Sequence, residues 1–128
     1  MKTLMLFMYI GIILYVTDHL EGSIWISKIG DQCVDTLRFK AKRSISEYSC
    51  EQEFTFHGKY SVSGDTVTII EKDDSHSEDN GKPTYFRSEY VMHKNKTLEL
   101  NSVSELVKNR WVLNKNPMQG NIRYERIK

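Results

Sequence analysis

The stretch FTFHGKYSVSGDTVTII, residues 54–70, decides the fold of this chain. Apolar or aromatic residues alternate with polar ones on both sides of the break at Ser63-Gly64-Asp65. Alternation at period two is typical of a strand with one buried face. Two such runs separated by a short Gly-containing break predict a tight antiparallel hairpin. The stretch therefore predicts a half-buried antiparallel β-meander.

The rest of the chain continues this pattern in short segments. Further strands are expected at Ile24–Ile26, Val34–Lys40, Ile45–Cys50, Tyr85–His93, Thr97–Leu100, Trp111–Leu113 and Ile122–Tyr124. One segment, 101–109, is ambiguous, because Ser102 with Glu105 resembles a capping box that would start a single helical turn. No segment offers a helix long enough for a parallel crossover. The expected fold is all-β, an antiparallel up-and-down meander of about eight strands.

Length and composition limit the organisation of the chain. Its 128 residues suffice for one domain, and a net charge of +1 gives no global attraction to nucleic acid or to an anionic membrane. Residues 4–16 are apolar or aromatic apart from Gly11. Such a run is typical of a signal-peptide core and is short for a membrane span, which needs about 20 residues. We therefore expect a signal peptide over 1–22, or an uncleaved anchor, and a domain over 23–128.

The two cysteines bracket a predicted hairpin. Cys33 and Cys50 flank two strand-like stretches with a turn at 41–44, so they would lie nearly opposite each other and close enough to bridge. Two buried free thiols are the alternative, favoured if the protein stays in a reducing compartment. No C-x-x-C spacing occurs, so redox catalysis and zinc binding lack their usual signature.

The order of these signals resembles one known family. In this sequence the signals are, in order, a strand with Trp25, Leu37-Arg38-Phe39, Gly58-Lys59-Tyr60, the run from Gly64 to Ile69, the strand 97–100 and the terminal segment 124–128. This order is similar to that of small bacterial lipocalin-like domains, over about residues 24–128. The resemblance implies a curled lipocalin-like β-barrel that is usually exported and often has no known ligand. The chain is shorter than larger lipocalins and lacks a clear long C-terminal helix, which argues against a deep ligand calyx.

The expected inward positions of such a barrel are mostly large. They are Phe39, Phe54, Phe56, Tyr60, Phe86, Tyr90, Met92, Trp111 and Tyr124. An eight-stranded barrel either fills its interior with side chains or holds one small ligand, and these rings favour a largely filled barrel. Binding of a small hydrophobic or amphipathic ligand would then be confined to one mouth. Its candidate wall residues are Tyr60, Phe86, Tyr90 and Trp111.

Signals for catalysis are lacking in the sequence. No nucleophile elbow, Walker loop, HExxH or GxGxxG motif occurs, and His57 and His93 fall on outward faces by parity. We expect a monomeric, exported, periplasmic or cell-envelope protein that is not an enzyme and uses no cofactor or metal. The alternative is a structural or protein-interaction module, inhibitor-like, that acts through the polar loop 72–83 or through the basic hairpin tip. That tip carries Arg38, Lys40, Lys42 and Arg43.

Overall fold

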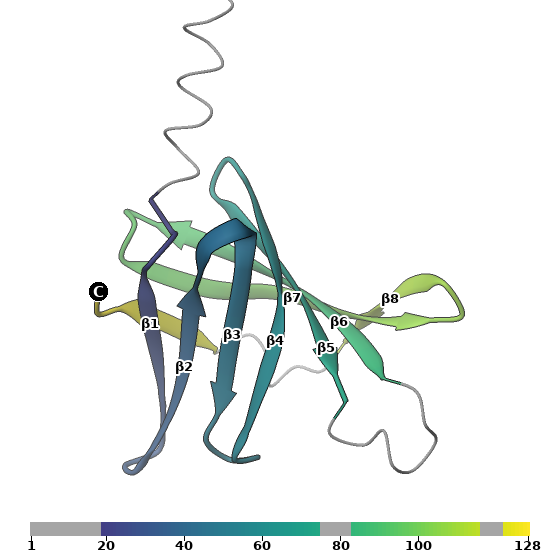
Figure 1. Ribbon diagram of the computed structural model, residues 1–128, viewed down its shortest axis with the longest axis horizontal. Helices are drawn as coiled ribbons and strands as arrows, with labels where there is room; N and C mark the ends of the chain where they lie inside the picture. The colour runs from purple at the N-terminus through teal and green to yellow at the C-terminus, as the bar shows by residue number, and fades with distance from the viewer. Residues whose placement is uncertain (1–18, 75–82, 116–121) are drawn as a thin grey trace, which may run out of the picture.

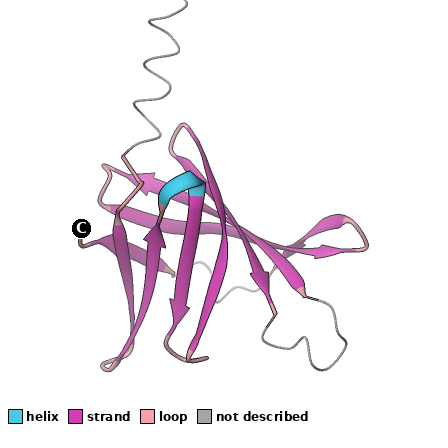
Figure 2. Cartoon of the chain, viewed as in Figure 1, coloured by secondary structure: helices cyan, strands magenta, loops and turns pink. Residues whose placement is uncertain are grey.

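Each alternating segment of the sequence forms a strand in the computed structural model, which describes residues 19–74, 83–115 and 122–128 (Figure 1). Strands make up almost all of the regular structure, with one short 3₁₀ turn, η1 (Ala41–Arg43) (Figure 2). The nine strands of the described residues are β1 (Ile24–Ile29), β2 (Cys33–Phe39), β3 (Ser44–Ser49), β4 (Phe54–Ser63), β5 (Thr66–Asp73), β6 (Thr84–His93), β7 (Thr97–Val107), β8 (Arg110–Asn114) and β9 (Arg123–Arg126).

Eight of these strands close into an antiparallel barrel. Strands β1 to β7 pair with their neighbours in chain order, and β9 then bridges β7 to β1. Strand β8 pairs only with the later part of β7, so the β7–β8 hairpin extends away from the barrel (Figure 1). This topology confirms the predicted all-β, antiparallel barrel in meander order.

Two of the tight turns between strands contain residues with a positive φ angle. Gly64, with φ +58°, lies in the two-residue connection between β4 and β5. Lys94 and Asn95, with φ of 52° and 55°, connect β6 to β7. Asn and Gly tolerate this left-handed conformation best, and two consecutive residues with positive φ match the twist of a hairpin. The short connections explain why sequence neighbours are also spatial neighbours.

The ambiguous segment is a strand, so the predicted helical turn is wrong. Strand β7 continues from Thr97 to Val107, and Ser102 pairs with Glu89 while Leu100 pairs with Tyr90. Asn101 is left between these pairs as a bulge. In the strand, the backbone N–H and C=O groups of this segment hydrogen-bond with β6. A helical turn would have broken this pairing.

The interior of the barrel is filled at one end only. At the end that holds η1, Trp25, Phe39, Ile45 and Ile69 are at most 2% exposed. The Phe39 ring packs edge-to-face on Trp25 and on Tyr60, with centroids 6.3 Å and 4.9 Å apart. We call this end the closed end. The opposite end, where β1 turns into β2 and β3 into β4, is the open end (Figure 1).

The N-terminal approach to β1 belongs to the closed end. Leu20 is 2% exposed, the amide of Gly22 donates to the carbonyl of Phe39, and the Trp25 indole donates to the Ser23 hydroxyl at 2.8 Å. Residues 19–22, which the sequence assigns to the leader, thus pack on the barrel, while 1–18 lie outside the described residues. Within the described ranges, no helix is long and apolar enough to cross a membrane.

Candidate functional site

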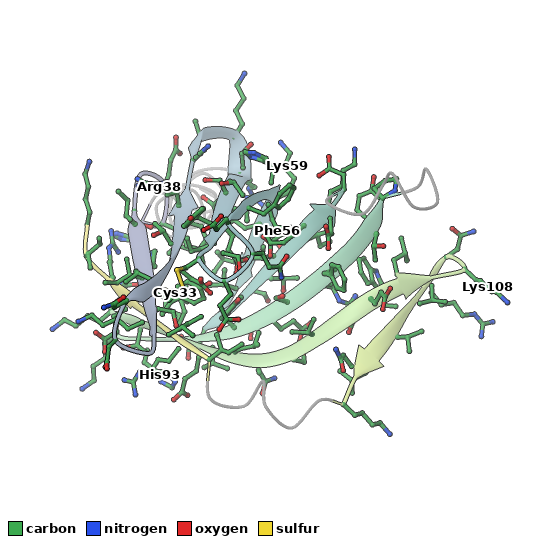
Figure 3. All side chains as sticks on the ribbon, turned by 90° about the horizontal axis from the view of Figure 1, so that it is seen from below. Cys33, Arg38, Phe56, Lys59, His93 and Lys108 are labelled. Atoms are coloured by element: carbon green, nitrogen blue, oxygen red, sulfur yellow. A yellow bond between two sulfur atoms is a disulfide. The ribbon has the colours of Figure 1, made fainter. Side chains whose placement is uncertain are left out.

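A cavity of about 580 Å³ occupies the open end of the barrel. Figure 3 looks onto this end: Phe56 lies near the middle of the ring of strands, and Cys33 lies beside the yellow disulfide bond. The cavity is bounded by the end of β1, the first halves of β2 and β4, the middle of β3 and the end of β5. Residues of β6, of the middle of β7, of the end of β8 and of β9 complete its wall. Ligand pockets of proteins fall in the range of about 300–1,000 Å³. The prediction of a largely filled interior therefore holds only for the closed end.

The cavity wall combines apolar and acidic side chains. Its apolar and aromatic part comprises Ile29, Phe56, Phe86, Tyr90, Leu100, Val103, Ile122 and Tyr124. Its charged part contains four carboxylates, Asp35, Glu47, Glu71 and Asp73, against one basic residue, Lys28. Lys28 is exposed and lies between the inward-facing Ser27 and Ile29. The cavity is therefore amphipathic and negatively charged.

Strand alternation places the carboxylates inside. On β5, Val67, Ile69 and Glu71 are buried in turn, so Glu71 continues the inward row. On β3, Glu47 follows the buried Ile45 by two residues, and on β2, Asp35 precedes the buried Leu37 by two. Since side chains of a strand change faces at every residue, these carboxylates point to the same interior as the apolar core.

Gly58 gives Glu71 room inside the barrel. It pairs with Ile45 on β3 and with Glu71 on β5, while Glu47 pairs with Phe56, the neighbouring inward residue of β4. A Cβ atom at Gly58 would overlap the backbone carbonyl of Ile70. Glycine is therefore required for the close approach of β4 and β5, and it places no side chain opposite Glu71 on β4.

Hydrogen bonds hold part of the acidic cluster. The Tyr124 hydroxyl donates to Oε1 of Glu47 at 2.9 Å, and the amide of Cys50 donates to Oδ1 of Asp35 at 2.8 Å. The Glu71 carboxyl hydrogen-bonds with Glu47. Its Oε2 atom, however, is buried and has no hydrogen-bond partner among the described residues. The fold thus orients the carboxylates of the cluster, but one oxygen of Glu71 lacks a hydrogen bond within the described part of the chain.

The cavity raises the pKa values of two of its carboxyl groups and of two tyrosine hydroxyls. Burial raises the pKa of Glu71 well above its ordinary value, and the negative charge of Glu47 raises it further. Burial also raises the pKa of Asp35, although the hydrogen bond from Cys50 opposes this effect. The pKa values of the Tyr90 and Tyr124 hydroxyls rise for the same reasons, burial first and Glu47 second. Glu71 is therefore protonated well above the pH at which an exposed glutamate ionises.

The four wall residues predicted from the sequence are not all brought together. Phe86 and Tyr90 line the cavity. Tyr60 is 7% exposed and lies deeper, against Phe39 in the closed end. Trp111 is on β8, and its ring stacks against Arg87, whose guanidinium carbon is 5.0 Å from the ring centroid. The expectation that Trp111 points inward is wrong, because β8 lies outside the closed barrel. Arg87, on which Trp111 stacks, is on the outer face of β6, since its neighbours Phe86 and Ser88 line the cavity.

The disulfide borders the same open end. Cys33 and Cys50 are bonded, with Cα atoms 5.5 Å apart, which confirms the predicted bridge. The bridge joins the start of β2 to the residue after β3, next to Asp35. It therefore fixes two strands that supply carboxylates to the cavity.

Two other groups of predicted candidates lie away from this site. His57 and His93 are exposed, and Nε2 of His93 is 3.1 Å from Oε2 of Glu99 on the outer face. Of the polar loop 72–83, residues 75–82 lie outside the described residues. No group of three or more His, Cys, Asp and Glu within the described part of the chain is arranged to hold a metal ion.

Comparison with known proteins defines the fold and not the family. The sequence matches no protein-family model and no curated protein. Among solved structures, the chain is similar to the crystal structure of pallilysin from Treponema pallidum, with a TM-score of 0.57 and 15% identity over 88% of this chain and 83% of that chain. A likeness at this low identity concerns the fold alone. The chain therefore shares a barrel fold with pallilysin.

Proposed function

We propose that this protein is a non-catalytic, exported, monomeric lipocalin-like barrel that binds a small amphipathic molecule in the cavity at its open end. The observation that carries the proposal is the coexistence of a filled closed end with an unfilled open end of about 580 Å³. A side-chain-filled barrel would bury its inward residues along the whole axis. Here, Phe56 and Phe86 remain only half-buried, which leaves their rings available to a ligand.

Two further observations support the proposal. The wall offers a few convergent polar groups, such as Ser27, Ser88 and Tyr124, within a mostly apolar surface, and this combination is the usual composition of a small-molecule site. The Cys33–Cys50 bridge supports export, because disulfides persist mainly in oxidising compartments.

A neutral fluorescent probe tests this function. N-phenyl-1-naphthylamine is apolar and uncharged at neutral pH, so the acidic wall does not repel it. We expect saturable binding with one site per barrel. The variant Val103→Trp places a large ring in the cavity and should weaken binding by about tenfold or more, since the ring occupies the space of the ligand.

The matched control is Val112→Trp. Val112 is 51% exposed on β8 and does not line the cavity, so this variant should bind like the wild type. Absence of a saturable site in the wild-type protein, or equal affinities for the two Trp variants, would refute the proposed function.

A further inference from the structure

The open end contains a buried carboxyl group that the fold leaves without full pairing. Glu71 is 7% exposed and belongs to the inward row of β5 with Val67 and Ile69. Its Oε2 atom has no hydrogen-bond partner among the described residues. Burying an unsatisfied carboxyl oxygen is unfavourable, so such a group in a cavity wall indicates a partner that enters from outside the fold.

Glu47 from β3, Asp73 on β5 itself and Tyr90 from β6 interact electrostatically with Glu71. Asp35 from β2 and Tyr124 from β9 line the same cavity, so the titratable groups around Glu71 are acidic or neutral. The only basic residue of the described cavity wall is Lys28, whose exposed side chain is at the rim. A ligand that carries a positive charge would supply the counter-charge that the protein itself does not place there.

The chemistry of the wall favours an organic cation over a metal ion. The described carboxylates do not form a metal-binding group of three. An ammonium group instead presents three N–H donors, which suit the carboxyl pair of Glu47 and Glu71. The half-buried rings of Phe56 and Phe86 form an apolar surface of the same cavity, against which a hydrocarbon body would pack.

We propose that the cavity binds a primary amine with an apolar or aromatic body, and that its ammonium group lies between Glu47 and Glu71. This inference rests on the proposed function, because it names the class of ligand that the same cavity takes. The ammonium nitrogen donates to both carboxylates, and the body of the ligand contacts Phe56 and Phe86.

Binding of such an amine has a defined proton balance. In the free protein, burial and Glu47 raise the pKa of the Glu71 carboxyl and so favour its protonated form. As the ammonium enters, the O–H bond of Glu71 breaks, its proton passes to the buffer, and an N–H donor of the ligand takes its place. A cation that merely approached exposed carboxylates at the rim would release no proton, because those groups are already ionised at neutral pH.

Three probes of the same size test the inference by calorimetry on the full-length protein at neutral pH. They are phenethylamine, which is a cation, 2-phenylethanol, which is neutral, and 3-phenylpropanoate, which is an anion. We expect the amine to bind about tenfold or more tightly than the alcohol and the anion to bind weakest. Titrations in buffers of different ionisation enthalpy should show proton release with the amine alone.

The variants Glu71→Gln and Glu47→Gln should reduce the preference for the amine over 2-phenylethanol to about twofold or less. The control Glu99→Gln makes the same chemical change at an exposed position outside the cavity and should keep the preference. If the amine and the alcohol bind equally, or the anion binds best, the inference fails while the proposed function stands. If neither these probes nor the neutral dye binds, both fail together.

Discussion

Glu71 shows how a single residue can link stability to the site. Its neighbours on the inward row of β5, Val67 and Ile69, are fully buried and apolar, and a glutamate in the next inward position is costly when ionised. The fold tolerates it because burial and Glu47 favour the protonated carboxyl, and because Gly58, which pairs with Glu71, places no side chain opposite it. The protein therefore has an acidic group inside the cavity at the cost of a lower free energy of unfolding.

The raised pKa of Glu71 predicts how stability depends on pH. Above the ordinary value of 4.5, the unfolded chain loses this proton while the folded protein keeps it. The folded state then binds more protons, so stability falls as pH rises, until the pH passes the folded pKa. In Glu71→Gln this group no longer titrates, and we expect a flatter profile between pH 5 and 8 and a gain of at least about 1 kcal/mol at neutral pH.

Urea unfolding of the wild type, Glu71→Gln and the exposed control Glu105→Gln across this pH range measures the effect. The control should follow the wild-type profile. A Glu71→Gln profile as steep as that of the wild type would show that Glu71 ionises normally in the folded protein.

At the scale of the elements, the sequence predicts strands well and their inward faces less well. The period-two pattern locates every strand and the tight turn at Gly64, since local alternation and turn chemistry are encoded in adjacent residues. The helical turn expected at Ser102 is wrong because pairing with β6, a long-range contact, outweighs a local capping signal. The bulge at Asn101 then shifts the inward parity of β7, which no local pattern reveals.

The same limit explains which site residues are missed. Continuing the inward rows by one step, from Phe39 and Leu37 to Asp35 and from Ile69 to Glu71, would have placed two carboxylates inside. That signal is present in the sequence, but acidic residues are normally assigned to the solvent face. Trp111 is misplaced for another reason: whether β8 closes the barrel or leaves it depends on which strand β9 pairs with.

The disulfide is the element-scale feature with the most direct effect on stability. It links residues 17 positions apart at the start of β2 and the end of β3. We expect the double variant Cys33→Ala, Cys50→Ala to be destabilised by about 3 kcal/mol, because the unfolded chain regains loop entropy. Urea unfolding with and without reductant measures this loss. Reductant should lower the stability of the wild type but not that of the double variant, and an unchanged wild type would argue against a stabilising bridge.

At the scale of the whole molecule, the two ends of the barrel differ in packing. The closed end packs Trp25, Phe39, Leu37 and Ile69 with almost no exposure, and the residues just before β1 cover it with Leu20. The open end holds the cavity, the acidic cluster and the disulfide. Because well-packed apolar side chains contribute most to stability, we infer that the closed end supports the fold, which leaves the open end free to carry less favourable groups.

A matched pair of variants on one strand tests this division. Leu98 and Leu100 occupy successive inward positions of β7, but Leu98 is fully buried in the core while Leu100 is 8% exposed and lines the cavity. Leu98→Ala should cost about 2–5 kcal/mol, as expected for a new void in a packed core, and should leave the affinity for N-phenyl-1-naphthylamine unchanged. Leu100→Ala should cost less, because it enlarges an existing cavity, and should alter that affinity. Urea unfolding and dye titration of both variants give the comparison. If both variants lost the same stability and had the same effect on dye binding, the closed end would not be specialised for stability or the open end for binding.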